Sequence, residues 1–285
     1  MGKKLTALLF VVCFAACVTA LAKILPGLPT GMDTYQLVFW AFALIFFPMN
    51  VIFFIMRFWS RNKSSGSFFL SLTASVFLMS GIYLFAAGAA GMGGGNAISF
   101  VFLTPLITIA LLPAMSKEKP GPGKILAVIV AACGAACIFI AGRSGMQIST
   151  EGFLLILGAS ACWSMFSLIS ARTRTVTHVN VYIYVTSCVV ISAAAMFLQS
   201  GFSMPELREI GILAILAALF LASVFFWAAA FKPAAVSFWA TTVYIVPAFM
   251  LLYEIVFRSG SIGVLGITGL SILGIALIYR MSVKA

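Results

Sequence analysis

Long apolar stretches alternate with short polar gaps along the whole chain. Each stretch is about 20 residues long, which is the length that a helix needs to cross the hydrocarbon core of a bilayer. The pattern predicts ten membrane-spanning helices and an all-α integral membrane protein. The expected spans are Leu5–Leu25, Thr34–Met56, Phe68–Ala87, Asn96–Met115, Lys124–Ala141, Gly152–Ala171, Val179–Gln199, Ile210–Phe231, Val236–Phe257 and Ile262–Tyr279.

Composition supports this reading of the pattern. Of the 285 residues, 63% are hydrophobic and 8% are charged, a balance that excludes a soluble globular protein. The gaps between the apolar stretches are also too short to hold a soluble domain.

Lysine and arginine cluster in alternate gaps, while most acidic residues lie in the other gaps. The positive-inside rule therefore predicts a multi-pass protein of the inner (plasma) membrane with both termini in the cytoplasm. The formal charge of +11 follows from this topology, so we expect contact with anionic lipid head groups and no binding of nucleic acid.

The second half of the chain weakly repeats the first. A shift of 142 residues lays Pro105 on Pro247 and aligns spans three to five with spans eight to ten. Five spans per half is an odd number, so the two halves, residues 1–142 and 143–285, are expected to enter the bilayer in opposite senses within one membrane domain. The alternative is a chance overlap of apolar helices.

Short motifs in both halves resemble EamA-type members of the drug/metabolite transporter superfamily. These motifs consist of Pro105, Glu118 and Gly134 in the first half, Pro247 and Gly269 in the second, and Lys23, Trp163 and Arg172. Ala15 and Gly260 stand where the family usually has tryptophan and glutamate. The resemblance implies a secondary transporter that works by alternating access and exports a small organic metabolite.

Aromatic residues provide candidate substrate contacts, because ring faces attract cationic and aromatic groups without a formal counter-charge. Several lie in spans three, six, eight and nine, which resemble the central-cavity helices of the family. Together with one amide, the expected substrate-binding residues are Tyr83, Asn96, Trp163, Phe166, Trp227, Trp239 and Tyr244. Few buried charges favour a neutral, zwitterionic or aromatic solute such as an amino acid or amine. The alternative for each ring is contact with lipid or with another helix.

Three further residues are candidates for coupling or gating. Pro105 and Pro247 interrupt helical hydrogen bonding at matching positions, which allows either a mobile helix or a static kink. Glu254 is the acid placed clearly inside a span. Arg258 follows it by four residues, so an ion pair near the outer surface is the alternative role.

Glycines at 88, 91 and 93–95 predict a tight turn between spans three and four. No metal site, cofactor or enzymatic activity is expected, because the chain has one histidine and scattered acids. The competing hypotheses are a membrane-embedded enzyme and a structural subunit that does not transport.

Overall fold

Helices account for nearly all of the chain that can be described. The computed structural model describes residues 32–59, 68–92, 103–115, 120–141, 149–173, 177–230, 244, 248 and 263–282. Within these ranges the helices are α2 (Thr34–Trp59), α3 (Phe68–Met92), α5 (Leu103–Met115), α6 (Pro122–Ala141), α7 (Thr150–Arg172), α8 (Thr177–Gln199), α9 (Leu207–Ala230) and α12 (Val264–Ser282). Each coincides with a predicted span. The predicted span Leu5–Leu25 and most of Val236–Phe257 lie outside the described residues.

The described helices suit a lipid environment. Five of them, α2, α3, α7, α8 and α9, are long and apolar enough to cross a membrane, and α5, α6 and α12 are shorter apolar helices. Large apolar side chains such as Phe54 on α2 and Ile278 on α12 are mostly exposed, as expected for surfaces that lipid tails cover. The chain is therefore a multi-pass membrane protein.

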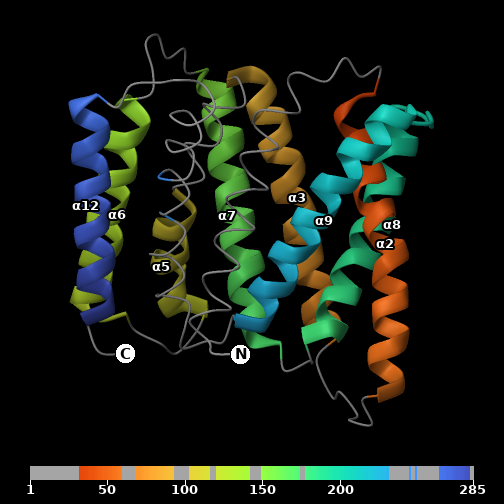
Figure 1. Ribbon diagram of the computed structural model, residues 1–285, viewed down its shortest axis with the longest axis horizontal. Coiled ribbons are helices and arrows are strands. Elements are labelled where there is room, and N and C mark those ends of the chain that lie inside the picture. The colour runs from red at the N-terminus through yellow and green to blue at the C-terminus, as the bar shows by residue number, and fades with distance from the viewer. Residues whose placement is uncertain are drawn as a thin grey trace.

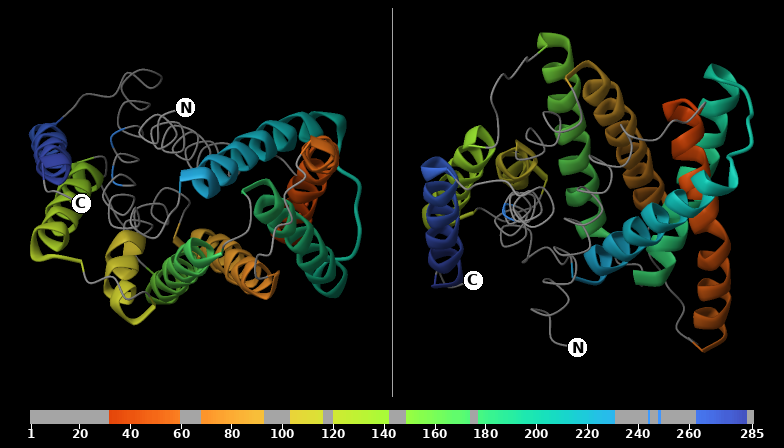
Figure 2. Two further views of the ribbon diagram at one scale, coloured as in Figure 1. Left: turned by 90° about the horizontal axis from the view of Figure 1, so that it is seen from below. Right: turned by 45° about the horizontal axis from the view of Figure 1, so that its top comes forward.

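Two helix pairs form the opposite edges of the bundle (Figures 1 and 2). At one edge α6 packs along α12, and at the other α2 packs against α8. Helices α5, α7, α3 and α9 lie between these pairs, with α7 packed against both α5 and α3. Helix α2 also packs against α9, and α3 against α8.

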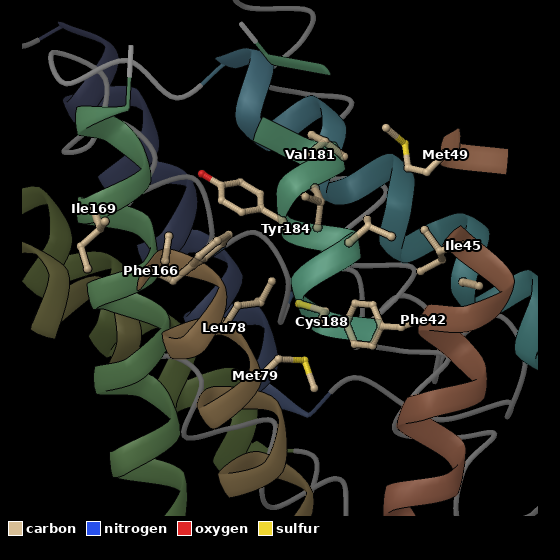
Figure 3. Close-up of a cluster of buried hydrophobic side chains, with 14 residues drawn as sticks. Phe42, Ile45, Met49, Leu78, Met79, Phe166, Ile169, Val181, Tyr184 and Cys188 are labelled. Atoms are coloured by element: carbon tan, nitrogen blue, oxygen red, sulfur yellow. The ribbon is translucent and has the colours of Figure 1, made fainter. Parts of the chain in front are cut away.

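The larger of the two main hydrophobic cores lies where α2, α3, α7, α8 and α9 meet (Figure 3). Phe42 of α2, Leu78 of α3, Phe166 of α7 and Cys188 of α8 are all buried in it. The second core lies between α5, α6 and α12, and it includes Tyr244. Both cores are therefore assembled from helices that lie far apart in the sequence.

Side-chain caps define where three helices begin, all at the surface predicted to be outer. Gln36 N donates to Asp33 Oδ1 over 2.9 Å and Asp33 N donates to Gln36 Oε1 over 3.2 Å, which is a capping box at the start of α2. Gly152 N donates to Ser149 Oγ over 3.2 Å before α7. Glu206 N donates to Glu209 Oε2 over 2.7 Å before α9. These bonds satisfy amide groups that the first helical turn leaves unpaired.

The glycine-rich turn predicted after span three begins later than expected. Helix α3 continues to Met92, so Gly88 and Gly91 are helical. A Cβ at Gly88 would lie 2.7 Å from the Ile156 side chain and 3.0 Å from Gly152 O of α7. Gly88 therefore allows α3 and α7 to approach closely, which is a common use of glycine between membrane helices.

A second close approach joins α6 to α12. A Cβ at Gly134 would lie 2.9 Å from Gly269 O and from Leu273 N, and a Cβ at Gly269 would lie 2.7 Å from Gly134 O and Ile138 N. Gly134 thus faces Leu273 while Ile138 faces Gly269, so the two helices run antiparallel. Their backbones are in direct contact at this crossing.

Candidate functional site

A series of aromatic rings, made of two separate contacting groups, lies at the larger core between α2 and α8. The rings of Tyr35 on α2 and Tyr83 on α3 have centroids 5.3 Å apart. On α7, the Trp163 and Phe166 rings meet edge to face with centroids 6.0 Å apart, and Phe166 meets Tyr184 of α8 in the same way at 5.4 Å. Tyr83, Trp163 and Phe166 were predicted substrate contacts, and the structure places all three at this core.

Tyr83 differs from its aromatic neighbours in the state of its hydroxyl. The oxygen atom is buried and has no hydrogen-bond partner, although the side chain as a whole is only half-buried. The hydroxyl of Tyr184, by contrast, donates to Ser170 Oγ over 3.0 Å. A buried hydroxyl without a partner is unfavourable by about 1–3 kcal/mol. The Tyr83 oxygen is therefore available to a solute that reaches this core.

Trp163 and Phe166 occupy different environments within the series. Phe166 is 2% exposed and stands between the Trp163 and Tyr184 rings, so it supports both. Trp163 is partly exposed and packs against the edge of the core.

Pro105 is buried in the first described turn of α5, beside a group of hydroxyls. Ser164 Oγ of α7 lies 3.0 Å from Thr104 O and 3.0 Å from Thr108 Oγ1. Thr108 Oγ1 also lies 2.7 Å from Thr104 O. The start of α5 is therefore bonded to the middle of α7 next to the proline.

The remaining predicted site residues lie in the second core, at the end of α9 or outside the described chain. Tyr244 is fully buried in the second core, beside Ala131 and Leu273. Trp227 lies in the last turn of α9. Asn96, Trp239, Pro247 and Glu254 lie outside the described residues. Among the described residues, no group of three histidine, cysteine or acidic side chains is placed to hold a metal ion.

A chain of polar side chains that the sequence analysis did not single out joins α3 to the α7–α8 connection. Ser71 Oγ donates to Asn180 Oδ1 over 2.9 Å, and Asn180 Nδ2 donates to Thr173 Oγ1 over 2.8 Å. Thr173 Oγ1 in turn donates to Ser170 O over 2.8 Å. We call Ser71, Asn180 and Thr173 the inner seam, because the predicted topology places this end of α3 at the cytoplasmic surface. In the sequence, the signal for this contact was Asn180, an amide side chain just inside the apolar span Val179–Gln199.

Polar contacts also join α2 to the α8–α9 connection at the opposite surface. Gln36 Nε2 donates to Gly201 O over 3.2 Å, and Trp40 Nε1 donates to Ser203 O over 2.9 Å. Near the other end of α2, Tyr182 Oη donates to Asn50 Oδ1 over 3.2 Å. Residue numbers that rise along α2 therefore fall along α8, so this pair is also antiparallel.

Comparisons with known proteins agree with the helical architecture. A crystal structure titled "Crystal structure of protein" superposes with a TM-score of 0.75 at 14% sequence identity, covering 97% of this chain and 95% of that chain. At this identity the likeness shows a shared fold alone. No curated protein matched the chain. Residues 3–140 match the EamA-like transporter family. The first half of the chain therefore belongs to the EamA-like transporter family, within the drug/metabolite transporter superfamily.

Proposed function

We propose that the chain is a secondary transporter that moves a small organic metabolite across the inner membrane. The cargo is neutral, zwitterionic or aromatic, such as an amino acid or an amine, and the direction is export. Transport proceeds by alternating access as two inverted five-helix halves, residues 1–142 and 143–285, rock against each other. The match of residues 3–140 to a transporter family supports transport. The motifs around Pro105 and Pro247, which resemble those of EamA-type exporters, support export.

The packing of the described helices supports the inverted halves. The antiparallel pairs α2–α8 and α6–α12 each join a helix to its counterpart from the other half, as a two-fold axis in the membrane plane requires. The Phe42 and Phe220 rings meet at 5.3 Å between α2 and α9. A shift of 142 residues carries Phe42 of α2 onto Tyr184 of α8, and the reverse shift carries Phe220 of α9 onto Leu78 of α3. Both pairs contribute to the larger core.

The observation that carries the substrate site is the buried, unpartnered hydroxyl of Tyr83. It lies beside the Tyr35 ring at the core where α2 and α3 of one half meet α7 and α8 of the other. A buried polar group that makes no hydrogen bond opposes folding, and a solute that accepts its hydrogen bond removes this cost. Aromatic faces around it suit a ligand with an aromatic or cationic part.

The test of transport uses purified protein in liposomes. Uptake and efflux of amino acids, amines and nucleobases are measured with labelled solutes, and we expect movement of at least one class. Folded protein that moves none of these solutes would contradict the proposal.

Tyr83→Phe tests the site itself. Because the hydroxyl has no partner, we expect thermal stability to be unchanged or slightly raised. The KM for the transported solute should rise about tenfold, the effect of losing roughly 1.4 kcal/mol of binding.

Tyr184→Phe is the matched control, since it removes a hydroxyl that is bonded to Ser170 Oγ. It should lower the unfolding temperature. If Tyr83→Phe destabilises the protein as much as Tyr184→Phe and leaves KM unchanged, the Tyr83 hydroxyl has a packing role and does not contact the substrate.

A further inference from the structure

The inner seam lies on a boundary between the two halves. Ser71 belongs to α3 of the first half, whereas Asn180 of α8 and Thr173, which follows α7, belong to the second. Ser71 is 0% and Asn180 6% exposed, so the bonds between them are shielded from water in this conformation. Separation of α3 from α8 at this surface requires these bonds to break.

The corresponding boundary at the other surface is chemically different. The position equivalent to Ser71, 142 residues later, is Leu213 of α9. The position equivalent to Asn180, 142 residues earlier, is Val38 of α2. Leu213 is 2% exposed and Val38 is partly buried, so this equivalent place carries apolar side chains. At these equivalent positions the two boundaries thus differ in polarity, while the hydrogen bonds of Gln36 and Trp40 to the α8–α9 connection lie elsewhere on the outer one.

The difference has an energetic consequence for opening. Polar side chains that separate at a water-filled mouth exchange their mutual hydrogen bonds for bonds to water, at a small net cost. Apolar side chains that separate in the same way expose surface to water and gain nothing in return. A polar contact at this position is therefore easier to open and close repeatedly than an apolar contact.

We propose that the inner seam is the cytoplasmic gate of the transporter, closed by the Ser71–Asn180–Thr173 hydrogen bonds and opened when water replaces them. This inference rests on the transport function proposed above. The gate lies at the predicted cytoplasmic ends of α3 and α8. The larger core lies deeper in the membrane, with Tyr83 on its side toward the opposite surface.

Cys188 provides a natural reporter behind the gate. It follows Asn180 by eight residues on α8, about 12 Å further along the helix, and it is fully buried in the core with Leu78 and Met79 of α3. Asn180, Tyr184 and Cys188 are spaced four residues apart, so they share one face of α8. Water that enters between α3 and α8 from the cytoplasmic side passes the inner seam before it reaches this thiol.

The experiment measures how fast a membrane-impermeant maleimide, added from the cytoplasmic side, labels Cys188 in vesicles of known orientation. The parent protein keeps Cys188 and carries alanine at the five other cysteines, which are Cys13, Cys17, Cys133, Cys137 and Cys162. We expect Ser71→Ala and Asn180→Ala each to raise the labelling rate about three- to tenfold, the effect of losing one or two interhelical hydrogen bonds.

Two further variants separate gating from general loosening. Ser75→Ala also removes a buried hydroxyl from α3, but that hydroxyl bonds to Ser71 O of its own helix, so labelling should not change. The double variant Ser71→Ala with Asn180→Leu replaces the seam by apolar groups of similar shape, and it should label more slowly than the parent.

Unchanged labelling in folded Ser71→Ala and Asn180→Ala overturns the gate, as does an equal increase in Ser75→Ala. Should Asn180→Ala fail to fold, Ser71→Ala and the double variant decide the matter. Labelling needs no substrate, so its result is independent of the transport assay. A seam effect in a protein that moves no solute refutes the proposed function, and intact transport without a seam effect refutes the gate alone.

Discussion

At the scale of single residues, the Ser164 hydroxyl shows how a polar atom is used inside the membrane. Its oxygen lies 2.8 Å from Ser160 O of its own helix and 3.0 Å from Thr104 O of α5. It also accepts a hydrogen bond from Thr108 Oγ1 over 3.0 Å. A serine that only needed to satisfy itself would bond to its own helix. The contacts across helices therefore hold α5 in place beside Pro105. They favour a static kink at this proline over a mobile helix.

Ser164→Ala should therefore destabilise the protein by about 0.6–1.7 kcal/mol, the range for interhelical bonds in membranes. Ser223→Ala is the matched control, because Ser223 is equally buried and bonds only to Leu219 O, four residues earlier on its own helix. Thermal unfolding in detergent measures both. Equal unfolding temperatures for the two variants would show that the bonds to α5 contribute nothing.

At the scale of helices, the α6–α12 crossing depends on the absence of side chains at Gly134 and Gly269. Gly134→Ala would place a Cβ 2.9 Å from the backbone of α12, so the helices must separate. We expect a loss of about 1–3 kcal/mol, as for other overpacked contacts.

Gly274→Ala on α12 should be tolerated, because a Cβ there meets nothing within 4 Å. Both variants are compared by thermal unfolding in the same detergent. An unfolding temperature that falls equally in both would point to a helix-wide effect of alanine and would contradict the role of the close contact.

The helices themselves could be predicted from sequence, but their partners could not. A span is recognised by its length and polarity, and every described helix falls on a predicted span. These helices are apolar around their whole circumference, because lipid and neighbouring helices are equally apolar surroundings. Periodicity therefore does not reveal which face of α3 meets α8. That is why Tyr83 and Trp163 could be proposed from residue type alone, whereas the contacts of Ser71 with Asn180 and of Tyr35 with Tyr83 were missed.

At the scale of the whole molecule, the two halves are interleaved. Helix α3 packs against α7 and α8, α5 against α7, α2 against α8 and α9, and α6 against α12. Each of these contacts joins residues before 142 to residues after 148 (Figure 1). Among the described helices, only α5–α6 and α8–α9 pack substantially within one half. Most of the described core is therefore built between the halves.

Because of this interleaving, we expect the peptide connection between the halves to be dispensable once both are in the membrane. Residues 1–142 and 143–285, expressed as separate chains, should assemble into an obligate heterodimer that co-purifies through a tag on either piece. Gly134→Leu in the first piece should weaken that association. Two pieces that each insert but never co-purify would contradict this expectation. If the two pieces do co-purify, the halves behave as complementary subunits, and the covalent link serves to set their stoichiometry at one to one.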